Sequence, residues 1–210
     1  MKKLILFLCL FVYIHLSFAQ EKSAIATLTM SIGDVYVKRI LEKKWESGHI
    51  GTQIFSGDRV KTRESGKVEV TFNDGSVIFL GNDSEIEFLN ENEEKPKKSL
   101  FLFFGSIFNE VKKGAAYEVE TVHALATVKG TEFFVNSDEN QMEVAVLSGS
   151  VLIQNEFGKQ KVSKGKKSIV SSDTKPSVKK FPKKENESYK INQINTNYSL
   201  TIKLPNPISE

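Results

Sequence analysis

The residue types that most often carry catalytic chemistry are scarce in this sequence. Its 210 residues include three histidines and one cysteine, and both Cys9 and His15 lie in the apolar N-terminal stretch. The other two histidines, His49 and His123, are far apart in the sequence. No serine or threonine stands in a nucleophile-elbow motif that could use either one as a base. His123 lies between Val122 and Ala124, so we expect a semi-buried histidine whose hydrogen bonds are satisfied by the fold.

Two pairs of acidic residues could act as paired carboxylates or as calcium ligands, namely Asp74 with Asp83 and Glu85 with Glu87. Asp74, however, belongs to a turn, and Glu85 and Glu87 alternate along a strand, which places both on its solvent face. No P-loop, dinucleotide fingerprint, zinc pattern or calcium-loop register occurs in the sequence. We therefore predict no catalytic residue, no cofactor and no metal, and a protein that is not an enzyme.

The N-terminal residues 1–19 have the pattern of a secretory signal peptide. Lys2 and Lys3 precede a short apolar run, and Ser17 and Ala19 supply the small side chains expected before cleavage at Gln20. The predicted location is therefore periplasmic or secreted, the alternative being an uncleaved leader that tethers the protein to the inner membrane. Cleavage would leave a chain without cysteine, whose stability cannot come from disulfides.

The net charge of +3 is modest and includes the two lysines of the leader. This charge does not predict a nucleic-acid-binding surface. Residues 172–188 form a basic segment with two prolines, which indicates an extended linker and the one place where contact with a membrane is expected. Residues 189–210 include an alternating run, 198–204, that predicts one C-terminal strand.

The stretch 57–80 organises the predicted elements, because Asp74-Gly75 is typical of a two-residue type I′ hairpin turn. Centred there, the turn pairs Phe72 with Val77 and Val70 with Phe79. In this register one face of the hairpin is wholly apolar and the other face of its first strand is polar. The apolar face carries Val68, Val70, Phe72, Val77 and Phe79, and the polar face carries Lys67, Glu69 and Thr71.

The remainder of residues 20–171 continues as short strands. A Ser148-Gly149 turn predicts a second hairpin, 127–135 reads as one strand interrupted by a bulge at Gly130, and 100–104 reads as a strand buried on both faces. Trp45 is expected to cover the edge of the core, with ligand stacking as the alternative. About a dozen short strands without a helical stripe predict an all-β sandwich or jelly-roll-like domain over 20–171.

The order of several motifs along the chain resembles the FecR domain family. The resemblance covers about residues 28–170, and its most specific pieces are 127–135, with Lys129-Gly130-Thr131, and 144–153, with Ser148-Gly149. Further pieces are Gly33-Asp34-Val35, the stretch 57–62, the Asp-Gly-Ser turn and 104–107. The motif residues, which we expect to be structural, are Gly57, Asp58, Asp74, Gly75, Gly105, Lys129, Gly130, Thr131 and Gly149.

This resemblance implies an extracytoplasmic β domain, which in well-known members of the family transmits a receptor signal to an anti-sigma module. We expect no anti-sigma segment here, because nothing stands before the leader that could bind a sigma factor, and the tail is short. The function expected is binding to another envelope component, a protein or a glycan. A regulatory role in trans-envelope signalling is the alternative, and a glycan-processing enzyme is a remote one.

Overall fold

The computed structural model describes residues 23–89 and 98–180, and every regular element in these ranges is a β-strand. The predicted all-β fold class is therefore confirmed, with 17 strands in place of the dozen or so expected. The predicted signal peptide with its cleavage site and the C-terminal strand lie outside the described residues. The strands are β1 (Ala26–Ile32), β2 (Val35–Lys38), β3 (Glu46–Ser47), β4 (Gln53–Ile54), β5 (Arg59–Thr62), β6 (Lys67–Phe72), β7 (Val77–Leu80), β8 (Glu85–Phe88), β9 (Lys98–Glu110), β10 (Ala116–Glu120), β11 (Leu125–Lys129), β12 (Glu132–Ser137), β13 (Met142–Ser148), β14 (Ser150–Asn155), β15 (Gly158–Ser163), β16 (Lys166–Val170) and β17 (Ser177–Lys180).

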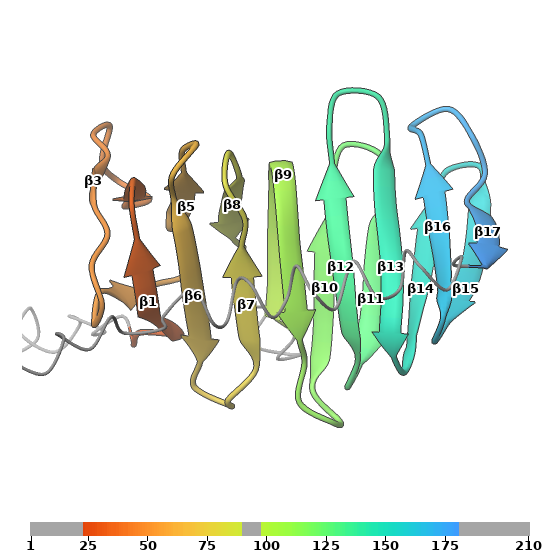
Figure 1. Cartoon of the computed structure of the whole chain (residues 1–210), viewed down its shortest axis with the longest axis horizontal. Coiled ribbons are helices and arrows are strands. Elements are labelled where there is room, and N and C mark those ends of the chain that lie inside the picture. Colours follow the sequence, from red (N-terminus) through yellow and green to blue (C-terminus); the bar gives the residue numbers. More distant parts are fainter. Residues whose placement is uncertain (1–22, 90–97, 181–210) are drawn as a thin grey trace, which may run out of the picture.

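The strands form two facing layers that are joined through β9 (Figure 1). We call sheet A the layer ordered β4-β1-β6-β7-β9-β12-β13-β16-β17. Sheet B is ordered β3-β2-β5-β8-β9-β10-β11-β14-β15. The first half of β9 pairs in sheet B and its second half in sheet A, so this single long strand belongs to both layers.

The chain passes from one sheet to the other at corners where glycine adopts a left-handed backbone conformation. Gly105, inside β9, has φ +95°, and a Cβ there would lie 2.3 Å from the Ser84 hydroxyl oxygen and 2.5 Å from its Cα. Gly130, between β11 and β12, has φ +71° and would place a Cβ 2.6 Å from the Cα of Lys113. Both corners therefore require glycine for its conformational freedom and for its lack of a side chain.

The two sheets enclose one core with aromatic rings at its centre. Phe72 of sheet A packs edge-on against Phe88 and Tyr117 of sheet B, with ring centroids 5.9 and 6.2 Å apart. Tyr117 also packs against Phe133, and its buried hydroxyl donates a hydrogen bond to Asn109 Oδ1 at 2.7 Å. Burial raises the pKa of Tyr117 well above its ordinary value, so this hydroxyl remains a donor.

The register of the β6–β7 hairpin differs by one residue from the predicted one. Val70 pairs with Ile78 and Thr71 with Val77, because Gly75, with φ +81°, follows a turn closed by its own N–H and the carbonyl of Phe72. The loop thus has three residues and a glycine bulge, not the two-residue type I′ form. The first strand keeps its predicted faces, but in the second strand Ile78 and Leu80 enter the core.

The side chains displaced from the predicted face form a small cluster on the outside of sheet A. Phe79 packs there with Met30 and Phe108, and Val77 and Phe134 lie beside them. The cluster keeps Phe79 at 7% exposure. Apolar residues on both sides of β7 therefore made either register compatible with the sequence pattern, and the turn geometry decides between them.

Two further predictions of local pairing are wrong, because in both cases the segments on either side of a glycine pair in different sheets. Ser148-Gly149 does not close a hairpin, because β13 pairs within sheet A and β14 within sheet B. Val144 and Val146 face Val151 and Ile153 across the core, as members of one buried cluster, and not as neighbours in one sheet. Likewise the break at Gly130 is a corner between sheets, not a bulge within one strand.

The folded body continues beyond Ser171, the predicted end of the β domain. Residues 177–180 form β17, which pairs with β16 at one edge of sheet A, and Val178 packs against the core. At the other end of the molecule, residues 46–54 cross from sheet B to sheet A through the short strands β3 and β4 (Figure 1). Gly48 is buried in this crossing segment, where a Cβ would lie 3.1 Å from Leu28, Val35 and Val37.

The observed hairpin register makes a testable prediction about neighbouring residues of β7. Replacing Ile78, which is 1% exposed, by alanine should lower the free energy of unfolding by about 2–5 kcal/mol, because it leaves a core cavity. Replacing the half-buried Val77 by alanine should cost about 1 kcal/mol or less. Urea denaturation of both variants measures the difference, and a larger loss at Val77 would contradict this register.

Candidate functional site

The acidic motif residue Asp58 holds the loop before β5 together. Its Oδ2 accepts hydrogen bonds from the Phe55 amide at 2.9 Å and from Arg39 at 2.5 Å, and Asp58 is 2% exposed. The neighbouring Gly57, with φ +87°, donates its N–H to the carbonyl of Phe88. A carboxylate that is buried and engaged in this way supports the backbone and has little access to a ligand.

The other motif residues also lie at turns and corners. Asp74 accepts a hydrogen bond from the Ser76 amide at 2.9 Å and pairs with Lys98. Thr131 donates to the carbonyl of Ser150 at 3.1 Å and so joins the corner at Gly130 to the corner at Gly149. The side chain of Lys129 is exposed. These positions shape the fold and bring no reactive groups together.

The residues considered for catalysis are separated from one another. His49 follows β3 and His123 precedes β11, and in sheet B the strands β2, β5, β8, β9 and β10 lie between β3 and β11. His123 is 5% exposed and its Nε2 lies 2.8 Å from the carbonyl oxygen of Asp138. Its Nδ1 is buried without a hydrogen-bond partner, so its hydrogen bonding is only partly satisfied. Asp74 lies in the turn before β7 and Asp83 in the turn after it, so the length of this strand separates the two carboxylates.

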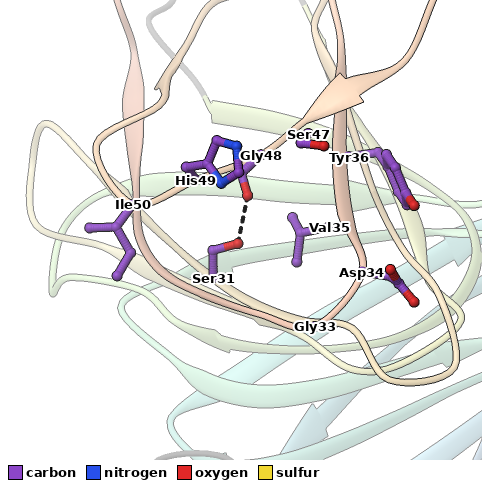
Figure 2. Close-up of a pocket in the computed structure, with 9 residues that line it drawn as sticks. All are labelled: Ser31, Gly33, Asp34, Val35, Tyr36, Ser47, Gly48, His49 and Ile50. Atoms are coloured by element: carbon purple, nitrogen blue, oxygen red, sulfur yellow. Dashed lines mark hydrogen bonds between the residues drawn. The ribbon is translucent and has the colours of Figure 1, made fainter.

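A cavity of about 410 Å³ lies near the N-terminal end of the sandwich, between the Gly33 corner and the segment that crosses at Gly48. Figure 2 shows its lining, in which Ser31 donates its hydroxyl hydrogen to the carbonyl of Gly48 at 2.7 Å. His49 and Asp34 are exposed at its rim. The lining residues therefore provide hydrogen-bonding groups but no activated nucleophile beside a base.

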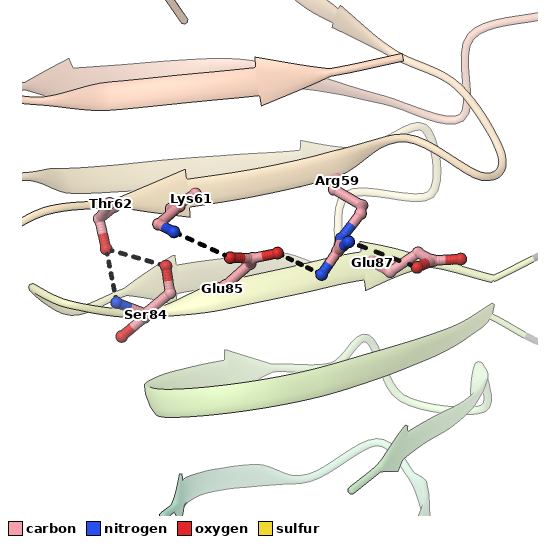
Figure 3. Close-up of polar contacts among 6 residues, drawn as sticks. All are labelled: Arg59, Lys61, Thr62, Ser84, Glu85 and Glu87. Atoms are coloured by element: carbon pink, nitrogen blue, oxygen red, sulfur yellow. Dashed lines mark hydrogen bonds and ion pairs between the residues drawn. The ribbon is translucent and has the colours of Figure 1, made fainter. Parts of the chain in front are cut away.

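A ladder of ion pairs crosses the outer face of sheet B (Figure 3). Glu85 on β8 pairs with Arg59 and with Lys61 of β5, the latter at 3.2 Å, and Glu87 lies 3.9 Å from Arg59. Glu85 alternates with core residues as predicted, yet it is only 5% exposed because the two cations cover it. The prediction of two solvated carboxylates is therefore wrong for Glu85.

Aromatic side chains extend this ladder on both sides. The guanidinium carbon of Arg59 lies 3.9 Å from the ring centroid of Phe103 on β9, and Phe103 packs against Phe101 at 4.7 Å. Trp45 lies near Arg59, Lys61 and Lys38, at 6.0, 5.7 and 5.5 Å from its ring centroid. We call Trp45, Arg59, Lys61, Phe101 and Phe103 the aromatic–cation face.

The sequence prediction missed this face for two reasons. The sequence predicts that the run 100–104 is buried on both sides, whereas only Leu100 and Leu102 enter the core and Phe101 and Phe103 remain partly exposed outside. The prediction that Trp45 covers the core edge is wrong, because Trp45 is half-buried beside cations and belongs to neither core cluster. The available signal was the alternation of Arg59 and Lys61 with Val60, which places two cations on one face of a strand.

In the part of the chain that the structure describes, no three His, Cys, Asp or Glu side chains come close enough to hold a metal ion. Nor do these residues include a helix of the length and apolarity required to span a bilayer. We take the aromatic–cation face as the candidate site, because it gathers aromatic rings and cations at partly exposed positions. Rings and fixed cations at partly exposed positions can stack on and pair with a bound partner.

The ion-pair ladder predicts unequal effects of its two acids. Glu85→Ala should lower the free energy of unfolding by about 2–3 kcal/mol, below the range for fully buried pairs, because Arg59 and Lys61 are partly exposed. Glu87→Ala should cost about 1 kcal/mol or less, since its side chain is 31% exposed. Urea unfolding measures both values, and equal losses would contradict the central role of Glu85.

The pKa of Asp74 predicts a pH effect of known sign. Partial burial raises this pKa, but hydrogen bonds from Lys98 and Ser76 outweigh it, and the pKa lies below its ordinary value of 3.8. The ionised carboxylate therefore stabilises the native state at pH values above 3.8, and this contribution disappears as the pH falls through the lowered pKa. Asp74→Asn should be less stable than the parent at neutral pH and equal to it in strong acid.

Thermal unfolding between neutral and strongly acidic pH checks this expectation. Lys98→Gln should weaken the pH dependence attributed to Asp74, because it removes the ammonium that pairs with the carboxylate. A stability difference between Asp74→Asn and the parent that persists unchanged into strong acid would contradict it.

The comparisons with known proteins agree with the fold. Residues 58–152 match the family model described as FecR protein. Two crystal structures of candidate anti-sigma factors from Parabacteroides distasonis ATCC 8503, at 1.65 and 2.50 Å resolution, are similar to this chain with a TM-score of 0.54 each. Sequence identity is 19% and 18%, and the matches cover 62% and 67% of this chain.

The matches span 63% and 74% of the two solved chains, and at these identities the likeness concerns the fold alone. A comparison with curated proteins gave no match. The matched segment begins at Asp58 and includes the motifs around Asp74, Gly105 and Gly130, whereas Gly33-Asp34-Val35 lies before it. The family resemblance found in the sequence is confirmed over residues 58–152, which match the FecR model.

Proposed function

We propose that this chain is an exported, non-enzymatic FecR-domain protein that binds another component of the cell envelope and thereby takes part in trans-envelope signalling. The family match over residues 58–152 supports a regulatory context. The two similar structures, described as candidate anti-sigma factors, support the same context. The leader-like residues 1–19, with predicted cleavage between Ala19 and Gln20, support export.

The aromatic–cation face carries the binding part of this proposal. Exposed aromatic rings beside an arginine are the combination most often found at the centres of protein interfaces. Here Glu85 fixes Arg59 against Phe103 before any partner arrives, which lowers the entropy lost on binding. Lys61 and Lys38 lie beside Trp45, so a partner surface with carboxylates and apolar side chains would complement this face.

A glycan is the second candidate ligand, and Trp45 is the observation that favours it. Its indole ring lies over the side chains of β2 and β5, with Lys38 and Lys61 beside it. A ring held in this way can stack on the apolar face of a sugar. A protein partner agrees better with the whole face, because Phe101 and Phe103 form a second aromatic site on the far side of the ion pairs.

Site-directed photo-crosslinking in the native envelope tests the proposed binding. A photoreactive residue at Phe101, on the outer face of sheet B, should capture one specific envelope protein. The same residue at Asn136, exposed on the outer face of sheet A, should not. Phe103→Ala should reduce the capture at Phe101 several-fold, because it removes the ring that Arg59 stacks on.

Three outcomes would contradict the proposal in different ways. Equal capture from both faces, or none, would reject the aromatic–cation face as the binding surface. An unchanged transcriptome after gene deletion would reject the signalling role, and turnover of a cell-wall polysaccharide by the pure protein would reject a non-enzymatic one. Mass spectrometry of the captured chain also shows whether it begins at Gln20.

A further inference from the structure

The two long edges of the sandwich carry opposite charge. One edge, the lower one in Figure 1, contains the β6–β7 turn, the loop between β9 and β10, and the corners at Gly130, Gly149 and Gly165. We call this the basic edge, because exposed lysines occur in its turns along the length of the molecule. They are Lys43, Lys44, Lys112, Lys113, Lys129 and Lys164.

Acidic groups at the basic edge are fewer and partly neutralised. Asp58 pairs with Arg39 and Asp74 pairs with Lys98, so neither carboxylate stands alone. Glu110 and Glu132 face each other in neighbouring strands, and Glu42 lies in the loop after β2. The opposite edge, the upper one in Figure 1, is acidic. Its exposed carboxylates include Asp34, Glu64, Asp83, Asp138, Glu139 and Asp173.

An apolar loop tip projects at the basic edge. Residues 39–45 connect β2 to β3, and Lys38 pairs with Arg59 at the end of β5 that lies on this edge. Leu41 in this loop is 93% exposed and Ile40 is 48% exposed. An exposed leucine followed, after Glu42, by Lys43 and Lys44 combines an apolar tip with cations, as in segments that bind to the interface of an anionic membrane.

Both ends of the described body lie at the same edge. Ala26 pairs with Phe72 beside the β6–β7 turn, so the chain enters β1 from the basic edge. Lys180 pairs with Lys166 next to the Gly165 corner, so the chain also leaves β17 there. The chain therefore enters and leaves the described body at the basic edge.

We propose that the basic edge docks on the surface of an anionic phospholipid bilayer, with Leu41 entering the interface between headgroups and acyl chains. Lysines distributed along the edge meet the lipid phosphates, while the acidic edge points away, where repulsion from the surface is least. A soluble polyanion would account for the lysines but not for an apolar tip among them. The proposal does not rest on the function proposed above, since it uses other residues.

This docking geometry leaves the aromatic–cation face accessible. The face lies on the outer side of sheet B, between the two edges, so both sheets would stand upright on the bilayer. A partner approaching along the membrane could then reach Phe101 and Phe103 without displacing lipid.

Vesicle binding of the full-length protein, purified in the form that cells produce, tests the proposal. Partition is measured by sedimentation with vesicles of phosphatidylcholine alone and of phosphatidylcholine with about one-third phosphatidylglycerol. We expect binding to the anionic vesicles only, and release when salt is raised from about 0.1 to 0.5 M. Trp45, the single tryptophan of the chain, is the last residue of this loop, and its fluorescence reports the burial of the loop in lipid.

Matched variants locate the contact surface. The double variant Lys112→Glu with Lys113→Glu should weaken partition at least about 30-fold, because each lysine near an anionic surface contributes strongly to binding. The same change of charge near the acidic edge, Lys159→Glu with Lys175→Glu, should alter partition less than about threefold. Leu41→Ser, at a position too exposed to affect folding, should weaken it several-fold and reduce the fluorescence shift.

The proposal is overturned if the parent binds neutral and anionic vesicles equally, because that would indicate insertion of the leader alone. It is also overturned if the two double variants lose equal affinity. Tight binding of soluble polyphosphate, lost in Lys112→Glu with Lys113→Glu and accompanied by no vesicle binding, would replace the lipid surface by a free polyanion.

Discussion

The whole architecture depends on the bend at Gly105, where one continuous strand leaves sheet B and enters sheet A. Because β9 pairs with β8 and β10 before the bend and with β7 and β12 after it, it joins both layers and fixes their separation. The bend brings the backbone against Ser84 and Asp83, at distances that exclude any side chain. Without this close approach, the two apolar faces could not share a core.

The outer faces of the sandwich have different roles because alternation along each strand assigns them separately. Sheet A covers its outer apolar residues with a small cluster around Phe79 and Phe108. Sheet B instead interleaves Arg59 and Lys61 with Glu85 and aromatic rings.

The sequence was sufficient for the fold class, the family and the inward residues of most strands, since period-two alternation depends only on local geometry. Pairing partners were less accessible. At Ser148-Gly149 the pattern of apolar residues is the same for a hairpin and for a corner between sheets, and only the positions of β12 and β14 distinguish them. The candidate site was missed because Phe101 and Phe103 look like core residues until the other side of β9 is known.

The strands succeed one another along the long axis almost in the order in which they occur in the sequence (Figure 1). From β9 onward, each new pair of strands is added to the end of the existing body, and most strand partners are close in the sequence. A chain that emerges N-terminus first can therefore fold progressively, each segment using the previous strands as its template. Growth from one end would leave only the last strands unprotected at any moment, which limits the time available for aggregation.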